Sequence, residues 1–305
     1  MFKDFSAKRN KKNRINNNLK LDALFRVRIL EQSALVSSDS GVGNSEKHNI
    51  VISLTSYDKR IHDLYLCIES LFQQSLKADL IVLWLSLKDF PGRVLPSLLR
   101  RQMERGLQVE FVDEDLGPYT KYFYAFKKFP DSLIVTVDDD ILYPVDMVDM
   151  LYQSYLKDPD HIYCHRSHRI EVDKQGNVLP YNKWRTTRDS WRGDMNITPS
   201  YRVFPTGVGG VLYYPGALHP DALNKEKFMK LCPKADDIWL KAMSLRQGIR
   251  CARVEDVRFW RDRFLTIPGG QATGLKKQNL KGRCGNDYKI RTVFSEYNLS
   301  NILME

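Results

Sequence analysis

Cysteine is scarce in this chain, and its few cysteines lie far apart. The five positions are Cys67, Cys164, Cys232, Cys251 and Cys284 among 305 residues. None has the close, paired spacing of zinc sites and disulfide frameworks, so the pattern argues against both. Unpaired thiols fit a reducing compartment, and we therefore expect a cytoplasmic protein.

Long hydrophobic runs are missing as well. The longest, around residues 80–85, has the length of a strand and falls short of the roughly 18 apolar residues that span a bilayer. The basic residues near the N-terminus are not followed by an apolar segment, so we expect neither a signal peptide nor a transmembrane helix.

The positive charge is unevenly distributed along the chain. The net charge is +10, and the first 30 residues contain nine Lys or Arg but only two Asp or Glu. We expect residues 1–18 to be disordered and residues 19–36 to form a basic amphipathic helix, because apolar residues recur there at helical spacing. Over residues 1–36 the chain can contact an anionic membrane peripherally or dock on its own body, and the sequence leaves both open. We expect no nucleic acid partner, since the charge is not spread over a folded face.

From residue 49 onward, apolar strands alternate with amphipathic helices. The pattern predicts strands over residues 49–55, 80–85, 109–112 and 133–137, and helices over residues 61–74, 94–105, 120–128 and 146–156. Such a series predicts an α/β fold with a Rossmann-like, mostly parallel sheet and helices on both faces. Ligands then bind at the carboxyl ends of the strands. We expect a basic tail over residues 1–48, a catalytic domain over 49–265, and a basic loop and helix over 266–305 that closes over the site.

Three consecutive carboxylates, Asp138, Asp139 and Asp140, follow the fourth predicted strand. Charges at the end of a buried strand are costly unless a cation meets them. Strand alternation places Asp138 and Asp140 on one side, where two hard oxygen ligands suit Mg²⁺ or Mn²⁺ shared with phosphates. The alternative is that these acids only cap the next helix, which Pro144 fits as an early residue.

A second acidic pair, Asp236 and Asp237, begins a helix predicted over residues 236–245. One carboxylate is enough to cap a helix, and a second one nearby raises the pKa of its neighbour. A carboxylate with a raised pKa is suited to act as a general base. A plain N-cap favoured by the helix dipole is the alternative.

Glycines and lysines supply three further candidate groups. Gly207, Gly209 and Gly210 permit close approach of the backbone to a ligand, although turns also use glycine often. Lys121 lies near a predicted helix N-terminus, where it fits phosphate binding, with a solvated lysine as the alternative. Lys276 belongs to a basic stretch that either closes over a diphosphate or forms a solvated edge.

Taken together, these motifs resemble the GT-A fold glycosyltransferases. The similarity is to the family 2 type and to bacterial enzymes that build capsule, O-antigen or lipooligosaccharide chains. In chain order, the motifs are the strand ending in Thr55-Ser56-Tyr57, the acids at 138–140, the glycines at 207–210 and the Asp-Asp-Ile-Trp-Leu sequence at 236–240. The resemblance covers roughly residues 49–290.

The resemblance implies a nucleotide-diphospho-sugar transferase fold and a metal-dependent hexosyl- or N-acetylhexosaminyltransferase. It implies Mn²⁺ or Mg²⁺, a nucleotide-sugar donor (a UDP-sugar), and a glycan or lipid-linked glycan acceptor. By position, Asp140 and Asp138 hold the metal, and Asp237 beside Asp236 is the base of an inverting transfer. The residues implied to contact the donor are Thr55, Ser56, Tyr57, Lys121, Asp138, Asp139, Gly209, Gly210 and Lys276.

The chain also departs from this family in two ways. No histidine occurs after His219 to complete the metal shell, so Asp256, Asp262, Asp287 or water has to substitute. The first member of the acid pair is Asp rather than Glu. A nucleotidyltransferase of the same fold is the rival hypothesis, but such enzymes need a glycine-rich loop after the first strand, and residues 56–60 contain no glycine.

Overall fold

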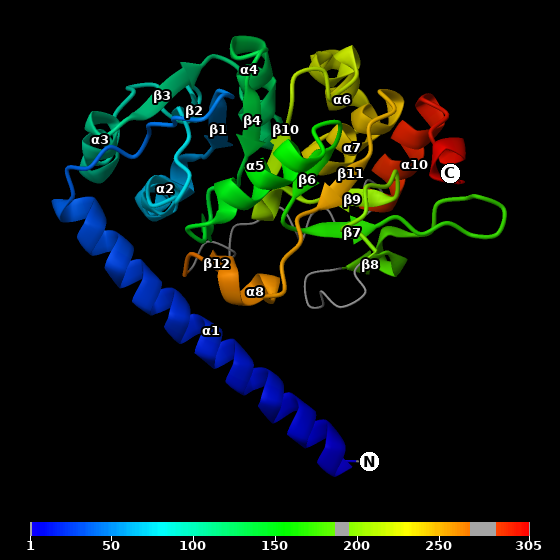
Figure 1. The fold of residues 1–305 in the computed structure, drawn as a ribbon, viewed down its shortest axis with the longest axis horizontal. Coiled ribbons are helices and arrows are strands. Elements are labelled where there is room, and N and C mark those ends of the chain that lie inside the picture. Colours follow the sequence, from blue (N-terminus) through cyan, green and yellow to red (C-terminus); the bar gives the residue numbers. More distant parts are fainter. Residues whose placement is uncertain (1, 187–194, 269–284, 305) are drawn as a thin grey trace.

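A seven-stranded β-sheet forms the centre of the computed structural model, which describes residues 2–186, 195–268 and 285–304 (Figure 1). The strands follow the order β11-β6-β10-β4-β1-β2-β3. Their bounds are β1 Ile50–Thr55, β2 Leu80–Ser86, β3 Leu107–Val112, β4 Leu133–Thr136, β6 Ile162–Cys164, β10 Val211–Tyr213 and β11 Cys251–Arg253. Of these seven, β10 alone runs antiparallel to its neighbours. The predicted α/β class with a Rossmann-like, mostly parallel sheet is confirmed.

Helices cover both faces of this sheet, as predicted. They are α2 Leu64–Phe72, α3 Ser97–Glu104, α4 Thr120–Lys128, α5 Met147–Lys157, α6 Lys225–Leu231, α7 Asp236–Arg246 and α10 Asn286–Glu296. Along β1, Ile50, Ile52 and Leu54 pack in the apolar cluster that contains residues of α2, α3 and α5. Val51, between them, packs on the opposite side with Ala125 of α4. Burial of both faces explains why the strand is continuously apolar.

Strand β10 enters the sheet at the edge where β4 ends. Its first residue, Val211, pairs with Thr136, the last residue of β4. The short 3-10 turn that precedes it, Gly207–Gly209, therefore lies beside the acids that follow β4. Gly210 permits the reversal, because its φ of +90° is rarely adopted by residues with a side chain. The antiparallel direction of β10 could not be inferred from the glycines in the sequence.

A two-stranded ribbon begins directly after the acids of β4. Strand β5 (Ile141–Leu142) pairs antiparallel with β12 (Leu265–Thr266), and the N–H of Ile267 donates to the carbonyl oxygen of Asp140 at 2.9 Å. The short helix α8 (Trp260–Arg263) precedes β12. A cluster of ion pairs ties this segment to the start of α5, joining Arg258 and Arg263 to Asp146 and Asp256. A small three-stranded sheet completes the fold and consists of β7 Ser167–Arg169, β8 Arg185–Thr186 and β9 Val203–Pro205.

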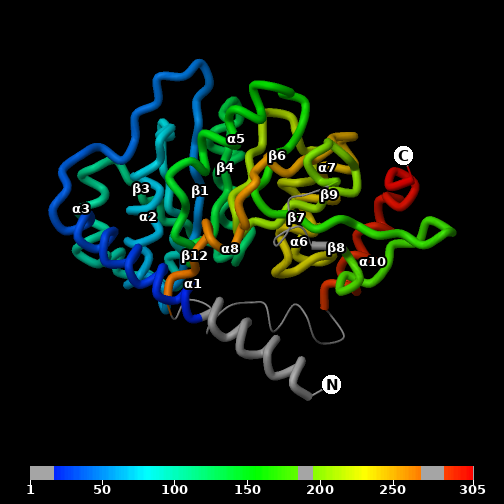
Figure 2. The backbone as a smooth tube through the Cα atoms, turned by 60° about the horizontal axis from the view of Figure 1, so that its bottom comes forward, coloured from blue at the N-terminus to red at the C-terminus, as the bar shows by residue number. Residues whose placement is uncertain are grey.

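The N-terminal helix α1 spans Phe2–Val36 and docks on the body through its C-terminal part (Figure 1). Leu30 and Ala34 are fully buried. The helix also lies beside β5 and β12 (Figure 2). The predicted helix over residues 19–36 is confirmed, whereas the prediction of disorder is wrong for residues 2–18, which belong to the same helix. No proline or glycine occurs between residues 2 and 36 to interrupt the helix.

The structure can be compared with the predictions about cysteines and membrane-spanning helices within the described residues. Cys67, Cys164, Cys232 and Cys251 are free and buried, and Cys284 lies outside the described residues. Within the described ranges, no helix combines the length and the apolar character needed to cross a membrane.

A buried carboxylate, Glu69 of α2, joins α1, α2 and α3. Its oxygens accept two hydrogen bonds from the guanidinium of Arg105, at 2.8 and 3.0 Å, and one from Gln102 at 2.9 Å. Ser33 of α1 donates a further hydrogen bond at 2.7 Å. Because Glu69 is completely shielded from solvent, its charge depends on these four donors.

We predict that Glu69→Ala lowers the free energy of unfolding by about 3–5 kcal/mol, since it leaves the Arg105 charge buried without its partner. Urea unfolding followed by circular dichroism measures this loss. Ser33→Ala is the control, because it removes one of the four donors and should cost only about 1 kcal/mol. Equal losses in the two variants would contradict the importance of the ion pair.

Candidate active site

Four segments that are distant in sequence meet at the carboxyl edge of the sheet. Lys121, in the first turn of α4, donates from Nζ to Oδ1 of Asp138 at 2.7 Å. The same Nζ lies 3.2 Å from Oδ2 of Asp236 at the start of α7. Asp237, the next residue, accepts a hydrogen bond from the backbone N–H of Gly207 at 3.0 Å. We call Lys121, Asp138, Asp236 and Asp237 the carboxylate–lysine cluster.

Gly207 occupies the point where this cluster converges. A Cβ atom on Gly207 would lie 3.1 Å from Nζ of Lys121, 3.3 Å from Oδ1 of Asp237 and 3.5 Å from Oδ1 of Asp138. The absence of a side chain therefore leaves room for these three groups to meet. The sequence drew attention to Gly209 and Gly210, but of the three glycines Gly207 is the one in contact with the acids.

The other two glycines contact different surroundings. A Cβ on Gly209 would lie 3.0 Å from Nε1 of Trp260 and 3.2 Å from Cβ of His165. On Gly210 it would lie 3.0 Å from Sδ of Met147, below the sheet edge. Gly209 thus lies against the side chains of Trp260 and His165. Gly210 contributes to the turn through its positive φ.

Burial and mutual repulsion control the ionisation of the carboxylate–lysine cluster. Burial acts to lower the pKa of Lys121, but Asp138, Asp236 and Asp237 outweigh it and raise that pKa above its ordinary value. Burial, followed by the charge of Asp236, raises the pKa of Asp237 to about 8. Burial also raises the pKa of Asp236. One ammonium cannot neutralise three carboxylates, so the cluster retains a proton near neutral pH.

The acids at the end of β4 have separate partners. Arg60 forms ion pairs with both Asp139 and Asp140, the latter at 3.2 Å, and Ser56 Oγ donates to Asp139 Oδ2 at 2.6 Å. Asp138 binds Lys121 instead. Burial and then the charge of Asp138 raise the pKa of Asp140 to about 6, although Arg60 acts in the opposite direction. The acids therefore carry more negative charge than Arg60 offsets.

Two sequence-based interpretations of these acids are corrected by the structure. Strand β4 ends at Thr136, and Asp139 and Asp140 lie in a turn, so strand alternation does not govern where their side chains point. Capping is not their role either, because their partners are Lys121, Ser56 and Arg60 rather than the N-terminus of α5. Asp237 likewise bonds to Gly207 of another segment, and the N-cap position of α7 is Ala235.

Backbone contacts hold this acidic turn in place. The N–H of Asp138 donates to the Tyr143 hydroxyl at 2.8 Å, and Cys67 Sγ donates to the Asp138 carbonyl oxygen at 3.4 Å. With the Ile267 bond to the Asp140 carbonyl, these contacts fix the main chain from the side of the protein body. The side chain of Asp138 remains one third exposed (33%) and is accessible to a ligand.

The remaining predicted donor-binding residues lie at the end of β1 or outside the described residues. Ser56 bonds to Asp139, and the Tyr57 ring lies under the guanidinium of Arg60, 5.5 Å from its centroid. Thr55 Oγ1 donates to the carbonyl oxygen of Trp84 at 2.9 Å, which ties β1 to β2. Lys276 lies outside the described residues.

Two of the carboxylates considered as substitutes for a metal-binding histidine, Asp256 and Asp287, are engaged elsewhere. Asp256 pairs with Arg258 and Arg263, and Asp287 Oδ1 accepts the backbone N–H of Tyr181 at 2.6 Å. In the described part of the chain, no three His, Cys, Asp or Glu residues are grouped so that they could hold a metal ion. Asp138 and Asp140, the predicted metal ligands, are therefore not part of such a group within the described ranges.

Three residues near the site were not singled out from the sequence. Arg60 is one, and its position five residues after the end of β1 was a usable signal, since that edge binds ligands in such sheets. Arg166 donates to Thr206 Oγ1 at 2.9 Å and lies over the Trp260 ring, 5.5 Å from its centroid. Trp260 stacks on Phe264, and its Nε1 is buried without a hydrogen-bond partner among the described residues. Nothing local in the sequence predicts this Arg–Trp pair.

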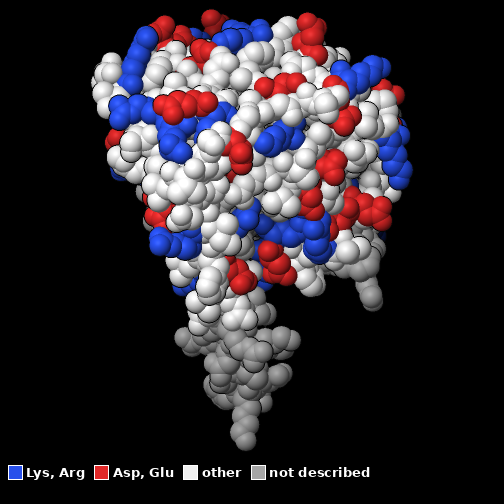
Figure 3. All heavy atoms as spheres, turned by 60° about the vertical axis from the view of Figure 1, so that its left-hand side comes forward, with Lys and Arg blue, Asp and Glu red and all other residues white. Residues whose placement is uncertain are grey.

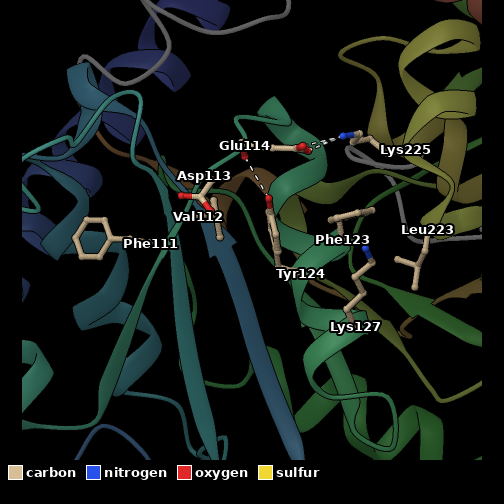
Figure 4. A pocket seen from close by; sticks show the side chains of 9 residues that line it. All are labelled: Phe111, Val112, Asp113, Glu114, Phe123, Tyr124, Lys127, Leu223 and Lys225. Carbon is tan, nitrogen blue, oxygen red and sulfur yellow. Dashed lines mark hydrogen bonds and ion pairs between the residues drawn. The ribbon is translucent and has the colours of Figure 1, made fainter.

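A separate hollow of about 560 Å³ lies where β3 ends beside α4 (Figure 4). Lys225 spans its rim by pairing with Glu114 at 2.8 Å. The residues that line it are Phe111, Val112, Asp113, Glu114, Phe123, Tyr124, Lys127, Leu223 and Lys225. None of them is a predicted site residue.

Comparisons with known proteins find similarity at the level of fold. No protein-family model matches the chain, and no curated protein sequence matches it significantly. Similar solved structures include the mannosyltransferase PcManGT from Pyrobaculum calidifontis in complex with GDP-Man and Mn²⁺, with 13% identity, a TM-score of 0.42 and coverage of 92% of this chain and 79% of that chain. Another is 4-diphosphocytidyl-2C-methyl-D-erythritol synthase from Anaerococcus prevotii, with 11% identity, a TM-score of 0.44 and coverage of 74% of this chain and 95% of that chain. A third is TarS 1–349 of S. aureus, with 12% identity, a TM-score of 0.43 and coverage of 68% of this chain and 58% of that chain. At TM-scores below 0.5, these similarities carry no inference about the reaction.

The raised pKa of Asp237 predicts an unusual dependence of stability on pH. Between the ordinary carboxyl value and about 8, folded Asp237 keeps a proton that the unfolded chain has lost. Its contribution to stability is therefore most favourable at low pH and declines as pH rises toward 8, by up to about 1.4 kcal/mol per pH unit. Asp237→Asn, which carries no charge, should become progressively more stable than the native chain as pH rises.

Urea unfolding of both proteins between about pH 5 and pH 9 measures this difference. Asp221→Asn is the control, since Lys227, Tyr297 and Arg246 outweigh burial and hold the pKa of Asp221 below its usual range. Asp221 is therefore ionised in the folded and the unfolded chain above about pH 5, and the stability difference between this variant and the native chain should stay constant. A constant difference between Asp237→Asn and the native chain across this range would show that Asp237 is not protonated in the folded protein.

Proposed function

We propose that this chain is a metal-dependent glycosyltransferase of the GT-A fold, which moves a sugar from a nucleotide-diphosphate donor to a hydroxyl group of a glycan. One observation carries the proposal: the acidic turn after β4 lies next to a separate, half-buried carboxylate with a raised pKa. Asp138 belongs to the turn and Asp237 is the separate carboxylate; Gly207 lies between the two, and Lys121 pairs with Asp138 and with Asp236, the neighbour of Asp237.

The acidic turn fits a divalent cation. Asp138 and Asp140 offer hard oxygen ligands, and the pKa of Asp140 is raised by burial and then by the charge of Asp138, which Arg60 offsets only in part. Mn²⁺ or Mg²⁺ would be held by these two side chains and would offset charge on the diphosphate as it leaves. Arg60 and Ser56 hold Asp139 beside them, which keeps the turn in one conformation.

The end of β1 supplies the groups that we assign to the nucleotide. Tyr57 presents an aromatic ring, and Arg60 lies over that ring while it pairs with the acidic turn. Lys121 is positioned to offset diphosphate charge, because its buried ammonium already binds Asp138. In this proposal Thr55 acts by fixing β1 to β2 through Trp84.

Asp237 is the residue we propose as the general base. Burial and Asp236 hold its pKa near neutrality, where a base accepts a proton from a hydroxyl most effectively. The N–H of Gly207 fixes one oxygen of Asp237 and thereby orients the other. Removal of the acceptor proton on the side opposite the leaving diphosphate inverts the anomeric centre. Following the motif resemblance, we propose a UDP-hexose or UDP-N-acetylhexosamine donor and a bacterial surface polysaccharide as the product.

We expect nucleoside diphosphates to stabilise the protein only together with a divalent metal. Thermal unfolding in a panel of nucleotides and sugar nucleotides, with Mn²⁺ or with EDTA, measures this effect. A ligand present at about 100 times its Kd contributes about 2.7 kcal/mol, and Asp140→Ala should abolish most of that gain. Stabilisation that persists in EDTA and in Asp140→Ala would refute the metal assignment.

The nature of the released product separates the proposal from a nucleotidyltransferase. A glycosyltransferase releases nucleoside diphosphate from the sugar nucleotide, and we expect Asp237→Asn to lower that rate by about 10²–10⁴-fold. Metal-dependent binding of the donor should be retained, because Asp237 is not in the acidic turn. Asp173→Asn, on an exposed loop, is the matched control and should keep full activity. Normal transfer by Asp237→Asn would refute the base assignment. Release of pyrophosphate from a nucleoside triphosphate supplied with a sugar phosphate would favour the nucleotidyltransferase.

A further inference from the structure

Helix α1 has apolar residues on two opposite faces, and the body of the protein covers only one of these faces. Ala23, Leu30 and Ala34 lie on the inner face and are buried against the body. Ser33 adds a hydrogen bond from this face to Glu69 of α2. The inner face accounts for the docking of the helix and for its contacts with α2 and α3.

The opposite face of α1 is apolar and exposed. We call it the outer face, and it consists of Leu21, Leu24, Phe25, Ile29, Leu35 and Val36, which are 52–68% exposed. At 100° per residue these side chains fall within one broad stripe, and that stripe points away from Leu30 and Ala34. Isolated exposed apolar residues are common on proteins, but six on one side of a single helix, with Arg28 and Gln32 among them, mark an interaction surface.

The charge on this helix indicates which partner the outer face fits. Lys20 is exposed beside the stripe, and Arg28 is exposed within it and pairs with Glu31 of the same helix at 2.9 Å. The first 30 residues of the chain contain nine basic and two acidic residues, whereas basic and acidic side chains are interspersed on the face of the body seen in Figure 3. Pairing of two such helices would bring like charges together, which disfavours a second copy of this chain. A partner surface that is apolar below an anionic layer matches both the apolar stripe and the basic residues of the helix.

We propose that the outer face of α1 binds the surface of an anionic lipid bilayer. The helix lies in the interface, with Phe25 and Ile29 at the acyl boundary and its basic side chains at the lipid phosphates. This proposal does not depend on the reaction that the protein catalyses.

The position of α1 places the candidate active site close to such a membrane. The helix contacts β5 and β12 (Figure 2). Strand β5 begins immediately after Asp140, and β12 is followed by Ile267, which bonds to the Asp140 carbonyl. If the proposed function holds, an acceptor anchored in lipid would reach the site over a short distance; this consequence rests on the proposed function, whereas the lipid contact does not.

Vesicle binding of the full-length chain tests the proposal. The native protein should float with vesicles of phosphatidylcholine and phosphatidylglycerol, bind phosphatidylcholine vesicles weakly, and detach at high salt. Phe25→Glu combined with Ile29→Glu should reduce the partition coefficient at least about tenfold, because two large apolar side chains no longer enter the interface. Both positions are exposed, so folding should be unaffected, which circular dichroism verifies.

A matched control separates the outer face from exposed apolar residues in general. Val94→Glu combined with Val257→Glu changes the same number of exposed apolar residues, 77% and 59% exposed, elsewhere on the body and should leave binding unchanged. Equal binding by the native chain and the Phe25/Ile29 variant, or no preference for anionic vesicles, would overturn the proposal. The face would be assigned to a second copy instead if the native chain bound no vesicles but formed oligomers, and the Phe25/Ile29 variant were monomeric. Stabilisation by nucleoside diphosphate and Mn²⁺, measured on the same variant, reports separately on the proposed function.

Discussion

The candidate site depends on one charge arrangement, the ammonium of Lys121 among the carboxylates of Asp138, Asp236 and Asp237. Without that cation, the carboxyl groups of Asp138, Asp236 and Asp237 would meet with no positive charge between them where β4, the glycine turn and α7 converge. The sheet fixes the backbone of this lysine, because the Ser53 hydroxyl of β1 donates to the carbonyl oxygen of Lys121. Ser53 in turn accepts a hydrogen bond from Trp84 Nε1 at 2.9 Å. A polar side chain in the interior of β1 thus has a clear purpose: it fixes the start of α4, and with it the cation.

The sheet topology explains why these groups meet. Parallel strands bring their carboxyl ends to one edge, and the acids after β4 and the polar residues after β1 are found there. The antiparallel strand β10 makes a different contribution, because it begins at this edge and so brings its preceding turn beside Asp138. A parallel β10 would place Gly207 at the opposite end of the sheet, away from Asp237.

Much of this fold could be predicted from the sequence, because the β-α series depends on periodicity among neighbouring residues. The prediction of α4 over residues 120–128 is confirmed at both ends, and the acids after β4 were identified for the same local reason. The antiparallel direction of β10 and the pairing of Arg60 with Asp139 depend on contacts between distant segments, which no local pattern encodes. The N-terminal part of α1 was mistaken for disorder because polar composition was given more weight than the absence of helix-breaking residues.

The charges at this edge also explain how ligand binding and protonation are linked. Five carboxylates, from the acidic turn and the pair at the start of α7, share the cations of Lys121 and Arg60. Burial, followed by the repulsion among these carboxylates, raises the pKa values of both Asp140 and Asp237, so the folded protein retains protons here. A divalent cation at the acidic turn would offset part of the negative charge and would release protons as it binds, because it favours the ionised carboxylates. The repulsion that weakens the folded state in the absence of ligand therefore also favours cation binding, and cation binding would favour the ionised form of Asp237 that a base requires.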